Sequence, residues 1–140
     1  TDGGMYYSEH GETMKKFNTR DGLAVELLSK QKINTIIITR ENSKIVKERG
    51  KKIKVLKTYV GILKKEVLLG EICRKYKINL DEIAYIGDDI NDYKIMKKVG
   101  FSCAPKDGVK KIKENSDYIC NSKGGEGVFR EITDLILSFS

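Results

Sequence analysis

Hydrophobic and polar residues alternate along the chain in blocks that predict strands and helices in turn. Short apolar runs indicate strands of a parallel sheet, because helices cover both faces of such a sheet. Longer stretches with apolar residues three or four positions apart indicate amphipathic helices. The predicted strands are 34–39, 53–56, 83–86, 101–104 and 118–120, and the predicted helices are 21–32, 41–49, 64–76, 91–99, 108–115 and 128–137. This alternation favours right-handed βαβ crossovers and therefore an α/β fold with a three-layer, Rossmann-like parallel sheet.

Turn-forming residues mark several element ends. Asn18 or Thr19 is expected to cap the helix 21–32, and Gly50 is expected to end the next helix. Ahead of them, residues of about 5–17 predict a protruding β-hairpin. No apolar strand precedes this hairpin, whereas a doubly wound sheet normally begins with its most central strand. We therefore expect a single domain over 1–140, without its first strand, from a longer polypeptide.

Composition narrows the class of protein. No apolar run approaches the roughly 20 residues of a membrane span, and no signal peptide is visible. The three cysteines are widely spaced, which predicts reduced thiols in a cytoplasmic protein. The chain carries 27 Lys and Arg against 20 Asp and Glu, a net charge of +7. Because the lysines are scattered doublets rather than one stripe interleaved with aromatic residues, we expect no nucleic-acid partner and no membrane partner.

The stretch 83–92 carries the densest candidate chemistry. Its predicted strand leads directly to Asp88, Asp89 and Asp92. Ligands bind at the carboxyl ends of strands in an open α/β sheet, and carboxylate oxygens there suit Mg²⁺. Three carboxylates this close repel one another unless a cation or base neutralises them. The plainer alternative is a solvated acidic turn that caps a helix.

Two further polar positions follow earlier predicted strands. Thr39 ends the strand 34–39, and Lys65 opens the helix after the following strand. A hydroxyl, an ammonium group and carboxylates on one sheet edge form a coherent phosphate and Mg²⁺ site. Taken alone, Thr39 is typical of a strand-end cap and Lys65 of a solvated side chain. Their order along the chain, together with the acidic turn, favours the phosphate site.

Five segments of the chain resemble a known family. They are TDGG at 1–4, FNTRDG at 17–22, IIIT at 36–39, GDDIND at 87–92 and GGEGVFRE at 124–131. In combination they resemble the haloacid dehalogenase superfamily of phosphotransferases over nearly the whole chain. The likeness is greatest to its small, capless sugar-acid phosphatases, which act on 3-deoxy-D-manno-octulosonate 8-phosphate or on nonulosonate (sialic acid or KDN) 9-phosphates.

The resemblance implies roles for the polar residues. Thr39 matches the second-motif hydroxyl that binds the transferred phosphoryl group, and Lys65 matches the third-motif lysine. Asp88 matches a direct Mg²⁺ ligand, with Asp89 and Asp92 supporting the metal or Lys65. The resemblance also implies a homo-oligomer, typically a tetramer. In it the hairpin takes part in assembly, and the C-terminal glycine-rich segment lies near a neighbouring active site.

The first motif of the family, DxDGxxT, is not present in full, because Thr1 aligns with its last residue. In the family the first Asp attacks phosphorus to form an aspartyl-phosphate, and the second Asp protonates the leaving alkoxide. No residue of this chain is assigned either role. We expect both to lie upstream of Thr1, and these 140 residues alone to be inactive.

The residues around Glu41 depart from the octulosonate enzymes, which usually have Thr-Gly-Arg where this chain has Thr-Arg-Glu. The acid resembles the KDN 9-phosphate enzymes, and Lys52 falls where those carry a companion lysine, which favours a nine-carbon substrate. A first-turn helix acid is the alternative for Glu41. Arg20 and Arg130 are candidates for bidentate contacts with a substrate carboxylate, or for surface ion pairs.

These observations predict a Mg²⁺-dependent phosphatase for a 2-keto-3-deoxy sugar acid phosphate, acting through an aspartyl-phosphate. The alternative is a non-catalytic oligomerisation module, fused to or associated with a cytidylyltransferase that activates sialic acids. A phospho-accepting receiver domain uses similar chemistry. It expects its acidic pair after the first strand, so the late GDDIND disfavours it.

Overall fold

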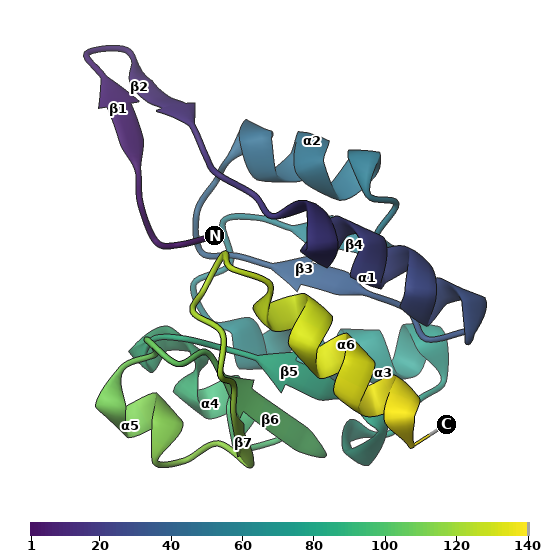
Figure 1. The fold of residues 1–140 in the computed structure, drawn as a ribbon. Helices are drawn as coiled ribbons and strands as arrows, with labels where there is room; N and C mark the ends of the chain where they lie inside the picture. The colour runs from purple at the N-terminus through teal and green to yellow at the C-terminus, as the bar shows by residue number, and fades with distance from the viewer. Residues whose placement is uncertain (140) are drawn as a thin grey trace. The chain divides into compact units, whose positions relative to one another are not determined.

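The computed structural model describes residues 1–139, in which strands and helices alternate (Figure 1). They form two compact units: residues 1–62 with the segment from Gly125 onward, and residues 63–124. Apart from the N-terminal hairpin, every strand pair in these residues is parallel, so the predicted α/β class is confirmed. No large cap domain is evident in the described chain. None of its helices combines the length and the apolar character needed to cross a bilayer.

The first unit contains a hairpin, a small parallel sheet and three helices. Its strands are β1 (Tyr6–Ser8) and β2 (Gly11–Met14), which pair antiparallel, and β3 (Ile36–Ile38) and β4 (Lys57–Tyr59), which pair in parallel. Its helices are α1 (Thr19–Lys30), α2 (Lys44–Lys52) and α6 (Val128–Ser138). Figure 1 shows the hairpin projecting from the chain as a two-stranded arm, as the sequence predicts.

Helix α1 begins at one of the two cap residues that the sequence suggests. Asn18 caps α1, since its side chain accepts the backbone N–H of Arg20 at 2.8 Å. Helices α1 and α6 contact each other and bury one apolar face each. Their buried apolar residues are Ala24, Val25, Leu28, Val128 and Ile132. The core of the unit is therefore partly built from segments far apart in the sequence.

Gly50 does not end a helix, contrary to the prediction. It lies inside α2, which starts at the cap Ser43 and continues to Lys52. A Cβ atom at position 50 would collide with the hydroxyl of Thr58 in β4. The glycine therefore serves the close approach of α2 to β4, not termination.

The strand expected at 53–56 is also misplaced. Ile53 still belongs to the end of α2 as its C-cap, and Lys54 has a left-handed backbone with φ of 60°. The chain turns at Lys54 and becomes extended only in β4, at 57–59. The apolar residues of 53–56 are thus a helix end and a connection.

The second unit is a three-stranded parallel sheet with short helices. Its strands are β5 (Ala84–Ile86), β6 (Phe101–Ala104) and β7 (Tyr118–Ile119), in the order β5-β6-β7. Its α-helices are α3 (Leu68–Tyr76), α4 (Tyr93–Met96) and α5 (Lys110–Lys113), and its 3₁₀ turns are η1 (Lys65–Val67), η2 (Leu80–Glu82) and η3 (Ile90–Asp92). Each α-helix lies within the range predicted for it.

Buried residues lie on both faces of β6, since Cys103 and Ala104 are consecutive and neither is exposed. Met96, Ala104 and Ile112 form a buried cluster, against which Tyr85 and Tyr93 pack. Strand β5 is only half-buried, although its apolar sequence predicts full burial. Among the described residues β5 pairs with β6 alone, so its second edge has no ladder partner there. The carboxyl end of β5 leads into the acidic turn.

Candidate active site

The acidic turn depends on a close approach at Gly87. This residue is buried directly after β5. A Cβ atom there would lie 2.5 Å from Cβ of Asp92 and 2.8 Å from Sδ of Met96, closer than packed atoms allow. Because glycine has no Cβ, the side chain of Asp92 can fold back against the start of the turn.

Asp92 is the centre of a buried polar cluster in the second unit. Its Oδ1 accepts hydrogen bonds from Lys65 Nζ at 2.6 Å and from the Tyr85 hydroxyl at 2.7 Å. Its Oδ2 accepts the backbone N–H groups of Asp88 at 3.0 Å and Asp89 at 3.4 Å. Only 1% of Asp92 is exposed. A buried carboxylate is tolerated when an opposite charge and further donors satisfy its oxygens, and all four donors here come from the protein.

Lys65 opens η1, which contacts α4 and so lies close to the acidic turn. The lysine is 7% exposed. The alternative of a solvated Lys65 is therefore wrong. An ammonium group has three donor hydrogens, and Asp92 uses one of them. The remaining hydrogens are available to another acceptor, such as a phosphoryl oxygen.

Tyr85 is a member of the site that the sequence reasoning missed. It lies in β5 and donates its hydroxyl to Asp92. Burial and the neighbouring Asp92 carboxylate both raise the pKa of Tyr85 far above its usual range, so the hydroxyl stays a donor. The sequence feature that could have identified Tyr85 is a phenol within an apolar strand that ends at carboxylates.

Asp88 and Asp89 differ from Asp92 in exposure. Both are exposed residues. Asp89 accepts the N–H of Ile90 at 2.6 Å and caps η3, as the capping alternative describes. Desolvation and the nearby Asp92 raise the pKa of Asp88, while the Lys65 ammonium opposes this increase. The carboxyl of Asp88 therefore lies in a locally negative field, which a divalent cation would relieve.

The three acids do not converge as one set. Within residues 1–139 no group of three or more His, Cys, Asp or Glu side chains is arranged to hold a metal ion. Asp92 is occupied by Lys65 and Tyr85, and Asp89 by the helix cap. A hard oxygen ligand in a negative field fits Mg²⁺, which takes one or two carboxylates and fills its other positions with water or phosphate oxygens. Asp88 is the residue here that fits this requirement.

The other predicted residues lie in the first unit. Thr39 follows β3, and its hydroxyl accepts the N–H of Glu41 at 3.1 Å, the local bond of a strand-end cap. Glu41 and Lys52 are exposed. Because Thr39 and Lys65 belong to different units, their convergence on one phosphoryl group stays a prediction.

The two candidate arginines also belong to this unit. Arg130 makes a surface ion pair with Asp134 at 2.7 Å, and its backbone N–H bonds Asp21 at 3.0 Å. The side chain of Arg20 is exposed. Contact of either arginine with a substrate carboxylate stays a prediction.

Comparison with known sequences gives one consistent family. A family model described as haloacid dehalogenase-like hydrolase matches residues 27–132. The 3-deoxy-D-manno-octulosonate 8-phosphate phosphatases of Salmonella typhi and Escherichia coli strain K12 are each 34% identical to this chain over 137 residues. These alignments cover 98% of this chain and 73% of each relative.

Solved structures agree with this result. A 3-deoxy-D-manno-octulosonate 8-phosphate phosphatase from Moraxella catarrhalis, in complex with magnesium, phosphate and KDO, has a TM-score of 0.93 at 36% identity, over 98% of this chain and 79% of that chain. A cobalt-bound phosphatase from Haemophilus influenzae has a TM-score of 0.95 at 31% identity, over 99% and 81%. The relatives are phosphatases, and two of their structures hold a divalent metal, so the predicted phosphomonoesterase class and metal cofactor are confirmed at the level of the family. This chain belongs to the haloacid dehalogenase-like hydrolases.

Proposed function

We propose that this chain is part of a Mg²⁺-dependent phosphatase that hydrolyses 3-deoxy-D-manno-octulosonate 8-phosphate. The observation that carries the proposal is the buried Lys65–Asp92 pair beside the exposed carboxyl of Asp88. The relatives named for this substrate are 34% identical over nearly the whole chain, which supports the same substrate class here.

Each residue of the site has a distinct proposed role. Asp92 holds the ammonium group of Lys65 in place, and the free hydrogens of Lys65 neutralise a phosphoryl oxygen. Asp88 binds Mg²⁺, with Asp89 supporting the turn. When bound, the metal neutralises phosphoryl oxygens and orients the phosphate. The hydroxyl of Thr39 contributes a hydrogen bond to the transferred group.

The route through an aspartyl-phosphate requires a nucleophilic carboxylate and a general acid. None of the 140 residues takes either role in this proposal. The proposal therefore requires both from residues other than these 140, so activity tests need the natural full-length protein. Without such residues the alternative holds, in which the domain is a non-catalytic module associated with a cytidylyltransferase.

The residues proposed to contact the sugar allow a second candidate substrate, a nonulosonate 9-phosphate. Glu41 favours it, because its N–H bonds the hydroxyl of Thr39 and the acid therefore begins next to the proposed phosphate position. Lys52 is its proposed companion, and Arg20 and Arg130 are the proposed ligands of the sugar carboxylate. Assembly as a tetramer in the cytoplasm belongs to the same proposal.

Phosphate release by the full-length protein tests these alternatives. With Mg²⁺ present, octulosonate 8-phosphate should be hydrolysed with the highest kcat/KM of a panel of sugar-acid phosphates. A clear preference for a nonulosonate 9-phosphate, reduced by Glu41→Arg, would move the assignment to the nine-carbon substrate. Release of no phosphate from any member of the panel would favour the non-catalytic module.

A further inference from the structure

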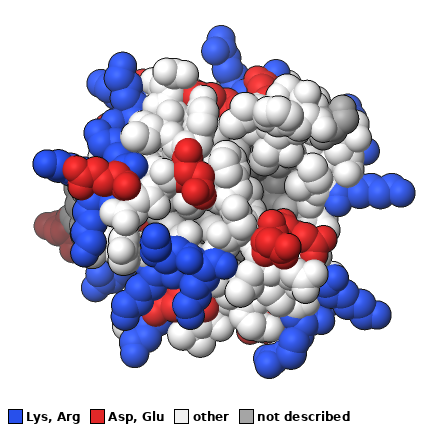
Figure 2. Space-filling model, turned by 90° about the horizontal axis from the view of Figure 1, so that it is seen from below, with Lys and Arg blue, Asp and Glu red and all other residues white. Residues whose placement is uncertain are grey.

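The positive charge of the chain is concentrated in one short segment. Residues 44–59, which comprise α2, β4 and their connection, hold seven of the 27 Lys and Arg residues and one of the 20 Asp and Glu residues. This segment therefore carries +6 of the net +7, and the remaining 124 residues are nearly neutral. On the face shown in Figure 2, by contrast, basic and acidic groups are interspersed.

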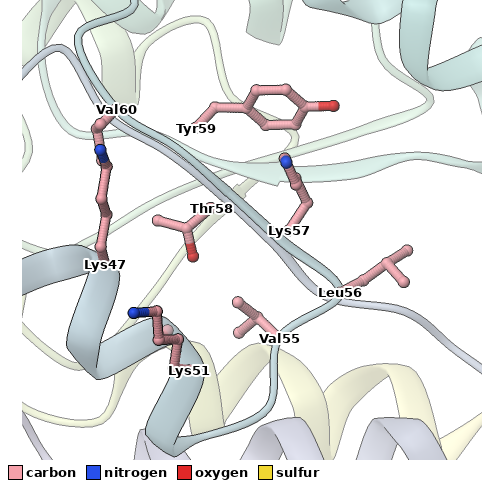
Figure 3. A pocket seen from close by; sticks show the side chains of 9 residues that line it. Lys47, Lys51, Val55, Leu56, Lys57, Thr58, Tyr59 and Val60 are labelled. Atoms are coloured by element: carbon pink, nitrogen blue, oxygen red, sulfur yellow. The ribbon is translucent and has the colours of Figure 1, made fainter.

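A hollow lies within this basic segment. It has a volume of about 550 Å³ and is formed by α2 on one side and β4 with its preceding connection on the other. Figure 3 shows Lys47 and Lys51 extending from the helix on the side of β4 that carries the Thr58 hydroxyl, whereas Lys57 and Tyr59 extend from the opposite side of the strand. We call these three lysines and the residues at 55–60 the α2–β4 hollow.

The lysines of the α2–β4 hollow have few internal acceptors. Lys51 pairs with Glu48 at 2.6 Å, but both side chains are largely exposed, so the pair is weak. Within the described residues Lys47 and Lys57 make no ion pair, and Nζ of Lys57 lies over the Tyr59 ring, 5.9 Å from its centroid. The hollow therefore presents positive charge that the unit does not neutralise.

The hollow also offers apolar surface and a strand edge. Val55, Leu56 and Val60 line it, and 44% of Leu56 is exposed. Among residues 1–139, β4 has a hydrogen-bonded ladder to β3 only. The C=O of Tyr59 accepts the N–H of Thr39 across that ladder, so the alternating backbone groups of Thr58 point to the opposite edge.

We propose that the α2–β4 hollow binds an extended acidic peptide segment of a partner protein. The segment adds alongside β4 and bonds its main chain to the free edge, as in β-strand addition. Its acidic side chains lie on the α2 side of β4, where they meet Lys47 and Lys51. Its intervening apolar side chains lie on the other side of the strand, beside Lys57 and the Tyr59 ring. Side chains alternate along a strand, so the segment has an alternating acidic and apolar pattern.

Two simpler roles for the basic residues explain fewer features of the α2–β4 hollow. A lysine on an edge strand protects against edge-to-edge aggregation, and this role suits Lys57. It does not account for Lys47 and Lys51, because these residues belong to a helix and not to the edge strand. A single-stranded nucleic acid would use the positive charge and also aromatic stacking surfaces, and Tyr59 is the single aromatic residue in the lining. Neither role uses the apolar surface together with the strand edge.

A binding measurement tests the proposal with a defined probe. The probe is a fluorescently labelled peptide of alternating Glu and Val, added to the full-length protein and followed by anisotropy. The double variant Lys47→Glu with Lys51→Glu reverses the charge of two lysines and should weaken peptide binding by about tenfold or more. The matched control is Lys94→Glu with Lys98→Glu, which changes two exposed lysines at the same spacing and should leave the affinity within about twofold. Circular dichroism checks that both variants are folded.

A second probe separates strand addition from simple charge attraction without changing the protein. The same peptide, N-methylated at every residue, keeps its charges but has no N–H donors for the edge of β4. The proposal predicts that it binds at least about tenfold more weakly. The proposal is overturned if the methylated peptide binds equally well, if both lysine variants lose affinity to the same extent, if oligouridylate binds as tightly as the acidic peptide, or if the peptide does not bind.

Discussion

At the scale of single residues, the three neighbouring carboxylates of the acidic turn lie in three different environments. Asp92 is buried and satisfied by four donors, Asp89 caps a helical turn, and Asp88 is exposed with a raised pKa. Repulsion among the three acids is therefore relieved in part by Lys65, before any metal binds. This leaves Asp88 as the carboxylate that a cation has most reason to contact.

The Lys65–Asp92 pair gives a direct stability prediction. Lys65→Met leaves a buried carboxylate without its counter-ion, so the free energy of unfolding should fall by about 3 kcal/mol. The neighbouring Lys64 is exposed, and Lys64→Met should change it by less than about 0.5 kcal/mol. Urea unfolding of both variants measures the difference. Equal effects would show that the buried pair does not stabilise the turn.

Asp117 provides the pH-dependent prediction. Its Oδ2 accepts the Ser102 hydroxyl at 2.7 Å and the Ser102 N–H at 2.8 Å, and these bonds lower the pKa of Asp117. The folded carboxylate is thus favoured, so its contribution is present above the unfolded pKa of about 3.9 and is lost as the pH falls below it.

The difference in unfolding free energy between the wild type and Asp117→Asn should therefore shrink as the pH falls from about 5 to about 3. Ser102→Ala removes one of the two donors and should show part of the same pH dependence. A difference that stays constant over this range would contradict the role given to the Ser102 bonds.

At the scale of elements, two glycines in helices have opposite roles. A Cβ at Gly50 would meet Thr58, whereas no atom lies within 4 Å of a Cβ at Gly70 in α3. Gly50→Ala should therefore lower the unfolding free energy by about 1–2 kcal/mol, despite the better helix propensity of alanine. Gly70→Ala should raise it by up to about 1 kcal/mol. Thermal unfolding of the two variants gives the signs, and a stabilised Gly50→Ala would refute the close packing of α2 on β4.

The elements that the sequence predicts well are those with local signals. Strand β6 occupies the predicted residues 101–104, and α1 begins at the predicted cap Asn18. Prediction fails where a tertiary contact overrides a local signal. The glycine at 50 resembles a helix stop, but contact with β4 keeps it inside α2, and this displaces the following strand.

The site follows the same division. Asp88, Asp89 and Asp92 are adjacent in sequence and could be identified from it. The contact of Lys65 with Asp92 spans 27 residues and depends on how η1 meets α4, which no local pattern specifies. Tyr85 looks like an ordinary strand residue, because the acceptor of its hydroxyl lies beyond the turn.

At the scale of the whole molecule, the distribution of charge bears on partner binding, and family membership bears on the reaction. Lysine doublets occur along the whole chain, which suggests a scattered positive charge. Acidic residues offset most of them, however, and the segment 44–59 carries nearly all of the net charge of +7. The family assignment rests on a match over 27–132 and on relatives of which this chain covers 73%. The chemistry of the proposed reaction needs carboxylates beyond those described, so the functional unit to test is the full-length protein.

The central claim is that Asp88 binds the Mg²⁺ of a sugar-acid phosphatase. The most direct test is phosphate release from 3-deoxy-D-manno-octulosonate 8-phosphate by the full-length protein over a range of Mg²⁺ concentrations. Asp88→Asn should lower kcat/KM by at least about a hundredfold and raise the Mg²⁺ requirement, while Asp81→Asn, at an exposed position in η2, should leave both unchanged. Activity of Asp88→Asn within about twofold of the wild type, at the same Mg²⁺ requirement, would contradict the assignment.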